Sequence, residues 1–219
     1  FQIKNIFQNS NFSKFDLKVT LLGAKSYLIK NIKIPTIGLH NIRNATAAIA
    51  VAVSVGISKK IILKGLKEFK GVQRRFTKIF TFKGVTFFDD YAHHPTEIRE
   101  VLNGVKNVYN NKEIICVFQP HRISRVKNLN KEFSFSFKKA DTVVLCPIYK
   151  AGENIKLGFK YINFAKSIIK NSKVNLILIK NNFDLIKYTK QNIFGDKIVI
   201  GMGAGSVSNW IRDLPNHLK

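Results

Sequence analysis

In the stretch FFDDYAHHPTEIREVL of this 219-residue chain, an apolar run ends in a dense group of ionisable side chains. Asp89, Asp90, His93, His94 and Glu97 could form a metal site, an acid/base set or a substrate site that needs both charge signs. Adjacent histidines cannot share one face of a helix, whereas helical zinc motifs place their two histidines four residues apart for that purpose. The spacing therefore favours a substrate site. A metal site, or a plain loop that caps the following helix, are the open alternatives.

A second group of polar side chains follows another apolar run, in the string FQPHRISR. It contains His121, Arg122 and Arg125. Arginine holds a carboxylate or a phosphate through two parallel hydrogen bonds, so arginines clustered at the end of a strand suit an anionic ligand. The alternative is a surface loop whose arginines pair with nearby acids, for instance Asp89.

The string HNIRNATAA, near the start of a helical pattern, places Asn41 and Asn44 on one helix face because they are three residues apart. An asparagine amide offers a donor and an acceptor side by side, which matches the N6/N7 edge of adenine. His40 and Asn44 could equally be capping residues, and the string by itself favours that simpler role.

The string GMGAGS follows the apolar run KIVI and invites interpretation as a phosphate-binding loop. It lacks the residue order of the P-loop, and it also lacks the later acidic strand of the dinucleotide fingerprint. We therefore expect these glycines to allow tight packing of a turn against the sheet.

The elements that must position these groups can be predicted from periodicity. Residues 1–34 have the character of short strands, and helical patterns follow from about His40 to Gly56 and onwards from Ser58. After the string VQRRF, short apolar runs alternate with helical patterns, which favours an α/β domain with a mainly parallel sheet and a boundary near residues 71–75. The predicted strand–helix pairs are 85–89 with 96–108, 114–118 with 127–139, 142–146 with 158–170, 174–179 with 182–192, and 197–200 with 206–213.

This order of elements also predicts where the two charged loops lie. Parallel sheets bind their ligands in the crevice at the carboxyl ends of the strands. The loop from Asp89 to Pro95 follows the first predicted strand of the second domain, and the arginine loop follows the next one. We therefore expect both loops to face the same crevice.

The composition restricts the class of protein. Hydrophobic residues make up 45% of the chain, which is ordinary for a globular protein, and no apolar run approaches the roughly 18 residues of a spanning helix. The 37 basic and 13 acidic residues give a net charge of +24, but the lysines are scattered. We therefore expect a solvated surface, with no nucleic-acid partner and no membrane insertion. Cys116 and Cys146 lie in apolar runs, as expected for buried, reduced thiols in a cytosolic protein.

Taken together, five strings resemble the Mur ligase family of peptidoglycan synthesis: GLHNIRNATAAIAVA, FKGVQRRF, DDYAHHPTEI, FQPHRISR and GAGS, in that order. They extend from Gly38 to Ser206. The string FQPHR, with Arg125 three residues on, resembles the branch that joins L-alanine to UDP-N-acetylmuramate rather than its murein-peptide recycling relative. The resemblance implies that residues 72–219 form the C-terminal, Rossmann-like domain. Residues 1–71 would be the C-terminal portion of a truncated central ATP-binding domain.

The activity that this resemblance implies is the ligation of L-alanine to UDP-N-acetylmuramate with ATP and Mg²⁺ in the bacterial cytoplasm. ATP would phosphorylate the muramate carboxylate, and the alanine amine would attack the resulting acyl phosphate. The family's P-loop, magnesium ligands and UDP-sugar-binding domain are expected upstream of residue 1, and the chain contains no Gly-Lys-[Ser/Thr] string. We therefore expect no ligase activity from this polypeptide alone.

The matching motif positions imply roles for individual residues. His40, Asn41 and Asn44 fall where the family holds adenine. Arg75 matches an arginine that meets the ATP phosphates, and Asp90 matches an acid that holds the ribose. The positions near L-alanine are Tyr91, His93, His121, Arg122 and Arg125. Of these, Arg122 suits the alanine carboxylate and His93 suits the proton of its amine, so we expect both to act in catalysis.

Three alternative functions are consistent with parts of the sequence. The nearest is a sister Mur ligase that adds another amino acid or a preassembled peptide. A basic nucleic-acid-binding module is suggested by the net charge, and a metal-dependent hydrolase by His93, His94 and Glu97. The sequence does not indicate an oligomeric state.

Overall fold

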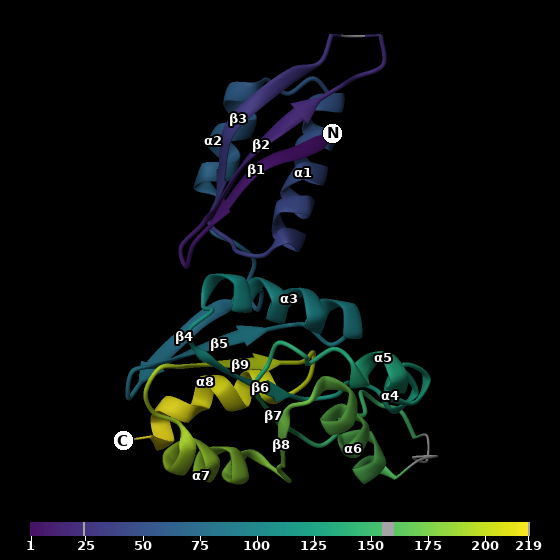
Figure 1. Ribbon diagram of the computed structural model, residues 1–219, viewed down its shortest axis with the longest axis vertical. Coiled ribbons are helices and arrows are strands. Elements are labelled where there is room, and N and C mark those ends of the chain that lie inside the picture. The colour runs from purple at the N-terminus through teal and green to yellow at the C-terminus, as the bar shows by residue number, and fades with distance from the viewer. Residues whose placement is uncertain (24, 155–159, 219) are drawn as a thin grey trace. The chain divides into compact units, whose positions relative to one another are not determined.

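A computed structural model of the chain describes residues 1–23, 25–154 and 160–218. The chain forms two compact units, and Figure 1 labels the elements of each. The first unit comprises Phe1–Gly71 with Asn107–Tyr109, and the second comprises Val72–Lys106 with Asn110–Lys219.

The first unit consists of a three-stranded antiparallel sheet and two helices. Its elements are β1 (Gln2–Gln8), β2 (Ser13–Val19), β3 (Tyr27–Ile34), α1 (Leu39–Ser54) and α2 (Lys59–Glu68). The central strand β2 alternates between buried and exposed side chains, as one face of the sheet packs on a core. Phe15, Leu17 and Val19 point into that core, where they join apolar side chains of β3 and both helices.

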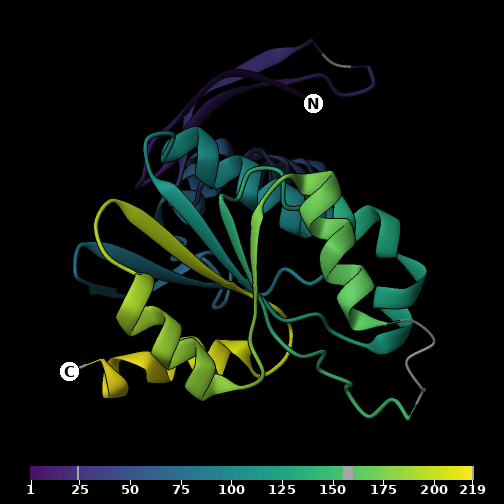
Figure 2. The same cartoon turned by 60° about the horizontal axis from the view of Figure 1, so that its bottom comes forward.

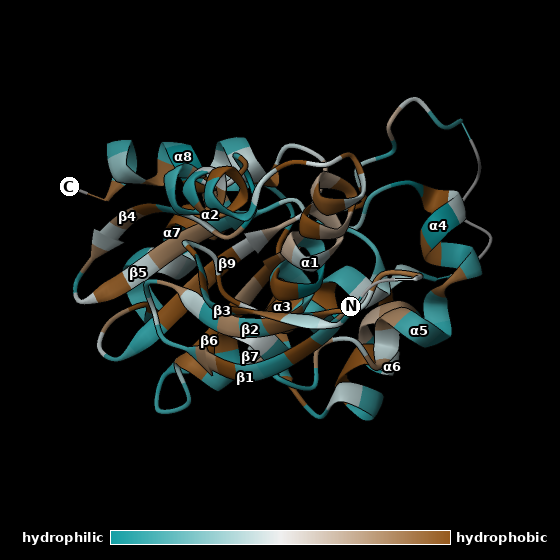
Figure 3. Cartoon of the chain, turned by 90° about the horizontal axis from the view of Figure 1, so that it is seen from above, coloured by the Kyte–Doolittle hydropathy of each residue, from teal (hydrophilic) through white to brown (hydrophobic). Residues whose placement is uncertain are grey.

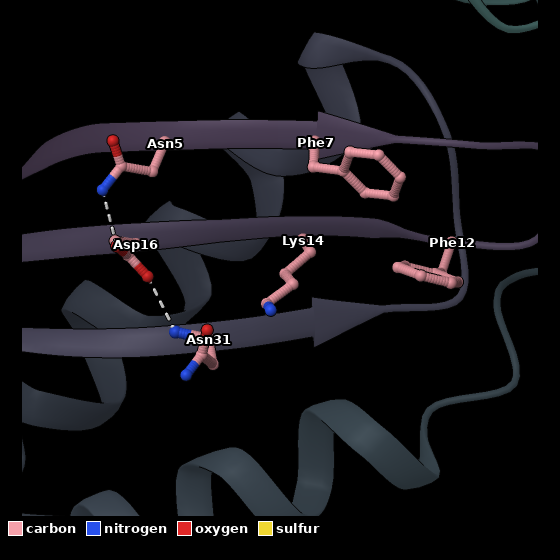
Figure 4. A pocket seen from close by; sticks show the side chains of 6 residues that line it. All are labelled: Asn5, Phe7, Phe12, Lys14, Asp16 and Asn31. Carbon is pink, nitrogen blue, oxygen red and sulfur yellow. Dashed lines mark hydrogen bonds between the residues drawn. The ribbon is translucent and has the colours of Figure 1, made fainter.

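The opposite face of this small sheet carries a pocket around Asp16 (Figure 4). The Asp16 carboxylate accepts hydrogen bonds from the side chain of Asn5 on β1 at 2.8 Å and from the backbone N–H of Asn31 on β3 at 2.8 Å. Both asparagines have positive φ, and each lies at a register shift between neighbouring strands. These bonds lower the pKa of Asp16, so its ionised form fastens the three strands together.

The second unit contains a six-stranded sheet in the order β4-β5-β9-β6-β7-β8. The first strand pairs antiparallel, and all the others pair in parallel. This confirms the predicted α/β class with a mainly parallel sheet. The elements are β4 (Thr77–Phe82), β5 (Val85–Asp90), α3 (Pro95–Val108), β6 (Glu113–Phe118), α4 (Ile123–Asn128), α5 (Asn130–Ser134), β7 (Thr142–Leu145), α6 (Tyr161–Ser172), β8 (Asn175–Leu178), α7 (Asn182–Asn192), β9 (Lys197–Met202) and α8 (Val207–His217).

Helices cover both faces of this sheet (Figure 2). On one face, Leu185 of α7 and Ile211 of α8 pack against alternate residues of the central strands. On the other face, Phe118 of β6 meets Phe133 of α5, which contacts Phe164 of α6. The central strands are therefore buried on both sides and are mostly hydrophobic, as Figure 3 shows for β6, β7 and β9.

Two details differ from the sequence predictions. The helix predicted over 127–139 is wrong, because the chain instead forms the short helices α4 and α5 and leaves helical geometry at Leu129 (φ −111°, ψ 24°). Strand β4 was not predicted, since it is an edge strand with only partly buried side chains. The helix predicted over 158–170 corresponds to α6, while residues 158 and 159 lie outside the described residues.

Candidate functional site

The two charged loops lie at the same edge of the six-stranded sheet. Strands β5 and β6 both run parallel to β9, which lies between them, so the carboxyl ends of all three meet there. The ring of His93, from the loop after β5, lies 5.7 Å from the ring of His121, from the loop after β6. The structure therefore brings the acidic loop and the arginine loop into direct contact.

A row of aromatic rings runs across these strand ends. Tyr91 meets His93 edge to face at a centroid distance of 5.1 Å, and His93 meets His121 in the same manner. His121 in turn stacks on Tyr149, from the loop after β7, at 5.5 Å and with an interplanar angle of 15°. Three loops therefore contribute to one continuous surface, and Tyr149 is a member that the sequence analysis did not identify.

Asp90 is buried at the end of β5 and organises the backbone around it. Its two carboxylate oxygens accept hydrogen bonds from the backbone N–H groups of Phe76 and Ala92, each at 2.8 Å. Burial raises the pKa of Asp90 to about 6, because removal from water disfavours the charged form more than these two donors favour it. Each oxygen has a second lone pair, so the carboxylate can still accept a further hydrogen bond from a ligand.

Asp89, the neighbouring residue, faces a different set of partners. Its fully buried carboxylate accepts hydrogen bonds from the hydroxyl of Ser208 at 2.7 Å and from Arg212 at 2.9 Å. The Nε of Arg74 lies 3.7 Å from the same oxygen. Asp89 therefore attaches α8 and the segment before β4 to the end of β5. Among the described residues, its ion pairs are with these two arginines rather than with the arginine loop.

The segment Arg74–Phe76 lies against the acidic loop. The backbone N–H of Tyr91 donates to the carbonyl of Arg74 at 2.7 Å, and the guanidinium of Arg74 lies 4.7 Å from the centre of the Tyr91 ring. Arg75 is exposed and lies 5.7 Å from that ring. The structure therefore places Arg75 beside Tyr91 and Asp90, in reach of a ligand that contacts this loop.

His93 is oriented by its own loop. Its Nδ1 lies 2.8 Å from the carbonyl oxygen of Tyr91, which accepts a hydrogen bond when that nitrogen carries the proton. A neutral ring held in this tautomer presents Nε2 as an acceptor, the form needed to take a proton from an amine. Glu97 accepts hydrogen bonds from the backbone N–H groups of His93 and His94, so it caps the start of α3.

The arginine loop has the opposite charge. Arg125 reaches back to His121, with its Nη1 3.3 Å from the backbone oxygen and 3.2 Å from Nδ1 of that histidine. Burial and the nearby Arg125 lower the pKa of His121, so its ring is neutral near pH 7. Arg122 is exposed, and its backbone has an unusual positive φ of 68°.

The glycines of GMGAGS pack closely in the middle of this edge, which confirms the expectation for that string. A Cβ added to Gly203 would lie 2.8 Å from the backbone oxygen of Gln119. One added to Gly205 would lie 2.6 Å from the Tyr149 ring. The Gln119 side chain also accepts a hydrogen bond from the N–H of Val207 at 3.0 Å, so it caps α8 from the neighbouring strand.

The remaining candidates, His40, Asn41 and Asn44, belong to the first unit. The amide of Asn41 donates to the carbonyl of Ile37 at 2.6 Å, and Asn44 is exposed on α1. The ring of His40 covers Gly38, whose φ is 95° and where a Cβ would lie 2.6 Å from the imidazole. These contacts fix the start of α1.

Within residues 1–23, 25–154 and 160–218, no group of three or more His, Cys, Asp or Glu side chains could hold a metal ion. No helix in the same ranges has both the length and the apolar character needed to cross a bilayer.

Comparison with protein families and curated relatives identifies the class that this fold and site define. Residues 74–205 match the family model described as Mur ligase, glutamate ligase domain, so the chain belongs to the Mur ligase family. This confirms the resemblance predicted from the five strings.

The relatives are more specific. The chain is 66% identical over 215 residues to a UDP-N-acetylmuramate–L-alanine ligase of Pelagibacter ubique, and that match covers 98% of this chain and 46% of the relative. A protein of the same name from Bartonella tribocorum is 36% identical, with coverages of 98% and 45%. The chain therefore spans about half the length of the curated relatives it matches.

Solved structures show the same fold. A UDP-N-acetylmuramate–alanine ligase from Thermotoga maritima is 26% identical, with a TM-score of 0.74 over 98% of this chain and 44% of that one. A murein peptide ligase from Psychrobacter arcticus has a TM-score of 0.69 over 99% and 44% of the two chains, and at 22% identity it supports the fold alone.

Proposed function

We propose that this chain is part of an ATP-dependent ligase that joins L-alanine to UDP-N-acetylmuramate in the bacterial cytoplasm, during synthesis of peptidoglycan precursors. The observation that carries the proposal is the 66% identity to a ligase of that name over nearly the whole chain. The contact between the acidic loop and the arginine loop supports it, because the reaction needs both charge signs at one place.

The reaction must turn a carboxylate into an electrophile. Transfer of the γ-phosphoryl group of ATP to the muramate carboxylate gives an acyl phosphate and ADP. The alanine nitrogen then attacks the carbonyl carbon and loses a proton, and the tetrahedral intermediate expels phosphate to leave an amide. A protein accelerates such a reaction mainly by positioning the reactants and by stabilising charge.

L-alanine would bind between the two loops. Arg122 and Arg125 supply the cationic groups that hold an amino-acid carboxylate. Tyr91 and His121 form the wall of aromatic rings beside them. With a proton on Nδ1 donated to the Tyr91 carbonyl, His93 would present Nε2 as the acceptor for the proton that the amine loses.

The family motifs imply nucleotide-binding roles for residues of the second unit and, separately, for residues of the first. Asp90 retains lone pairs for a ribose hydroxyl, and the exposed Arg75 suits the phosphates. His40, Asn41 and Asn44 would contact adenine, as the family motif implies. When bound, Mg²⁺ would supply charge neutralisation at the ATP phosphates.

A chimaera tests this proposal. The 215 matched residues of the Pelagibacter ubique ligase are replaced by those of this chain, and the formation of ADP and of the UDP-muramoyl-alanine product is measured with a panel of amino acids. We expect ATP turnover that requires both L-alanine and UDP-N-acetylmuramate. The 219-residue polypeptide alone should be inactive. A stable chimaera that turns over only with another amino acid or a peptide would contradict the proposal.

A further inference from the structure

The loop after β7 binds the arginine loop from one side, and we call its residues Tyr149–Glu153 the strap. The backbone of Tyr149 pairs with His121 in an isolated parallel bridge. Its N–H donates to the carbonyl of Pro120 at 2.8 Å, and its carbonyl accepts from the N–H of Arg122 at 2.8 Å. The rings of Tyr149 and His121 also stack on each other. The first residue of the strap therefore fixes the backbone on both sides of His121.

The other end of the strap holds the residues that follow Arg122. Glu153 accepts a hydrogen bond from the backbone N–H of Ser124 at 3.1 Å and another from its hydroxyl at 2.5 Å. These bonds are the main reason that the pKa of Glu153 is lowered, and the charge of Arg122 contributes as well. Near neutral pH the Glu153 carboxylate is therefore ionised and hydrogen-bonded to Ser124.

Between these two attachments lies the strained residue. Arg122 has a φ of 68°, a region that non-glycine residues occupy at a cost of about 1–3 kcal/mol unless the surrounding structure imposes it. The bond to Tyr149 holds its N–H, and the bonds to Glu153 hold Ser124, two residues further on. Released from either attachment, the backbone at Arg122 would relax towards negative φ and its guanidinium would point elsewhere.

We propose that the strap is a positioning element for Arg122, and that Glu153 is a positioning residue that sets the affinity for the amino-acid carboxylate by acting through Ser124 on the Arg122 backbone. This deepens the proposed function and rests on it for the identity of the ligand. Glu153 itself does not touch the substrate in this account.

One arm of the test requires no enzymatic activity. Amide hydrogen exchange is measured in the 219-residue chain and in Glu153→Ala, with Glu113→Ala as the matched control, because Glu113 pairs with Lys197 at the start of β6. We expect faster exchange at the amides of Arg122 and Ser124 in Glu153→Ala, and unchanged exchange at Val117 within β6. Unchanged protection of the Arg122 amide would overturn the proposal, whatever the chain's function.

The second arm uses the ligase chimaera. Glu153→Ala should raise the KM for L-alanine about tenfold and leave the KM for ATP unchanged, whereas Glu153→Gln, which keeps an oxygen acceptor for Ser124, should have a smaller effect. In a double-mutant cycle, Arg122→Ala combined with Glu153→Ala should be no worse than Arg122→Ala alone.

Additive effects in that cycle, or equal changes in both KM values, would mean that Glu153 supports the fold generally and would overturn its positioning role. If Glu153→Ala fails to fold, Ser124→Ala takes its place in both experiments, because it removes the hydrogen bond from the Ser124 hydroxyl to Glu153. An inactive parent chimaera would count against the proposed function, and the exchange experiment would still decide whether the strap holds Arg122.

Discussion

The acidic loop and the arginine loop lie side by side but differ in how far their charged side chains are buried. Asp89 and Asp90 are almost completely buried, and their carboxylates accept hydrogen bonds from two backbone N–H groups, from Ser208 and from Arg212. Arg122 is exposed, and its backbone N–H donates a hydrogen bond to the carbonyl of Tyr149. The two buried carboxylates therefore hold neighbouring backbone and helix α8 in place, whereas the exposed Arg122 suits the ligand-binding role that we propose for it.

The largest expected effect is a loss of stability when the buried carboxylate of Asp89 is removed. Asp89→Ala removes the acceptor of the hydrogen bonds from Ser208 and Arg212 and the carboxylate that pairs with Arg74 at 3.7 Å. We expect a loss of about 3 kcal/mol in the free energy of unfolding of the second unit, at the lower end for buried pairs because Arg212 is partly exposed. Urea denaturation measures this. Asp213→Ala removes a half-exposed carboxylate whose bonds to Asn216 and His217 are local to α8, so it should cost far less stability. Equal losses in both variants would contradict the assignment.

Asp90 gives the buried loop a pH dependence. Its pKa is raised to about 6 in the folded chain, from an ordinary value near 3.8. A raised pKa contributes stability that is fully present below about pH 4 and is lost as the pH rises through about 6. The loss should reach at most about 3 kcal/mol, at about 1.4 kcal/mol per pKa unit. Denaturation of the parent and of Asp90→Asn between pH 4 and 7 tests this, and the same slope in both would contradict it.

A smaller effect concerns the glycine loop that separates the two charged loops. Gly205→Ala would push a methyl group against the Tyr149 ring and the Gln119 side chain. We expect a loss of about 1–2 kcal/mol in unfolding free energy, since overpacking displaces neighbours that are fixed on other strands. Gly65→Ala is a suitable comparison, because nothing lies near that position in α2, and it should be neutral or slightly stabilising.

The smallest expected effect is the pH dependence of stability that comes from Glu153, and its sign is opposite to that of Asp90. The pKa of Glu153 is lowered by its bonds to Ser124, so its contribution to stability is present at neutral pH and is lost as the pH falls through its folded pKa. Comparison of the parent with Glu153→Gln in acid should show a slightly steeper loss in the parent. An identical acid response in both would indicate that the Glu153–Ser124 contact does not persist in solution.

Much of the fold could be predicted because the central strands are buried on both faces and read as unbroken apolar runs. Strand β4 was not predicted, because a half-exposed edge strand lacks an unbroken apolar run. The long helix expected after β6 failed because periodicity could not reveal the break at Leu129.

The candidate site was predictable where its residues are contiguous, as with Asp90, Tyr91 and His93, or Arg122 and Arg125. Tyr149 and Glu153 were missed because they reach the arginine loop only through the pairing of β7 with β6. The bond between Asp89 and Arg212 spans 123 residues and depends on where α8 crosses the sheet. The rule that ligands gather at strand ends did apply to the loop after β7, and would have directed attention to it.

We propose that the exposed Arg122 binds the carboxylate of the amino acid, whereas the buried Asp90 binds the nucleotide and also holds the backbone of its own loop. The most direct test is the steady-state KM for L-alanine and for ATP in the ligase chimaera, for Arg122→Ala, Asp90→Asn and the exposed control Arg99→Ala on α3. Arg122→Ala should raise the KM for L-alanine by about 100-fold with little change for ATP, Asp90→Asn should act chiefly on ATP, and Arg99→Ala should alter neither. Equal changes in the two KM values for Arg122→Ala would contradict the account.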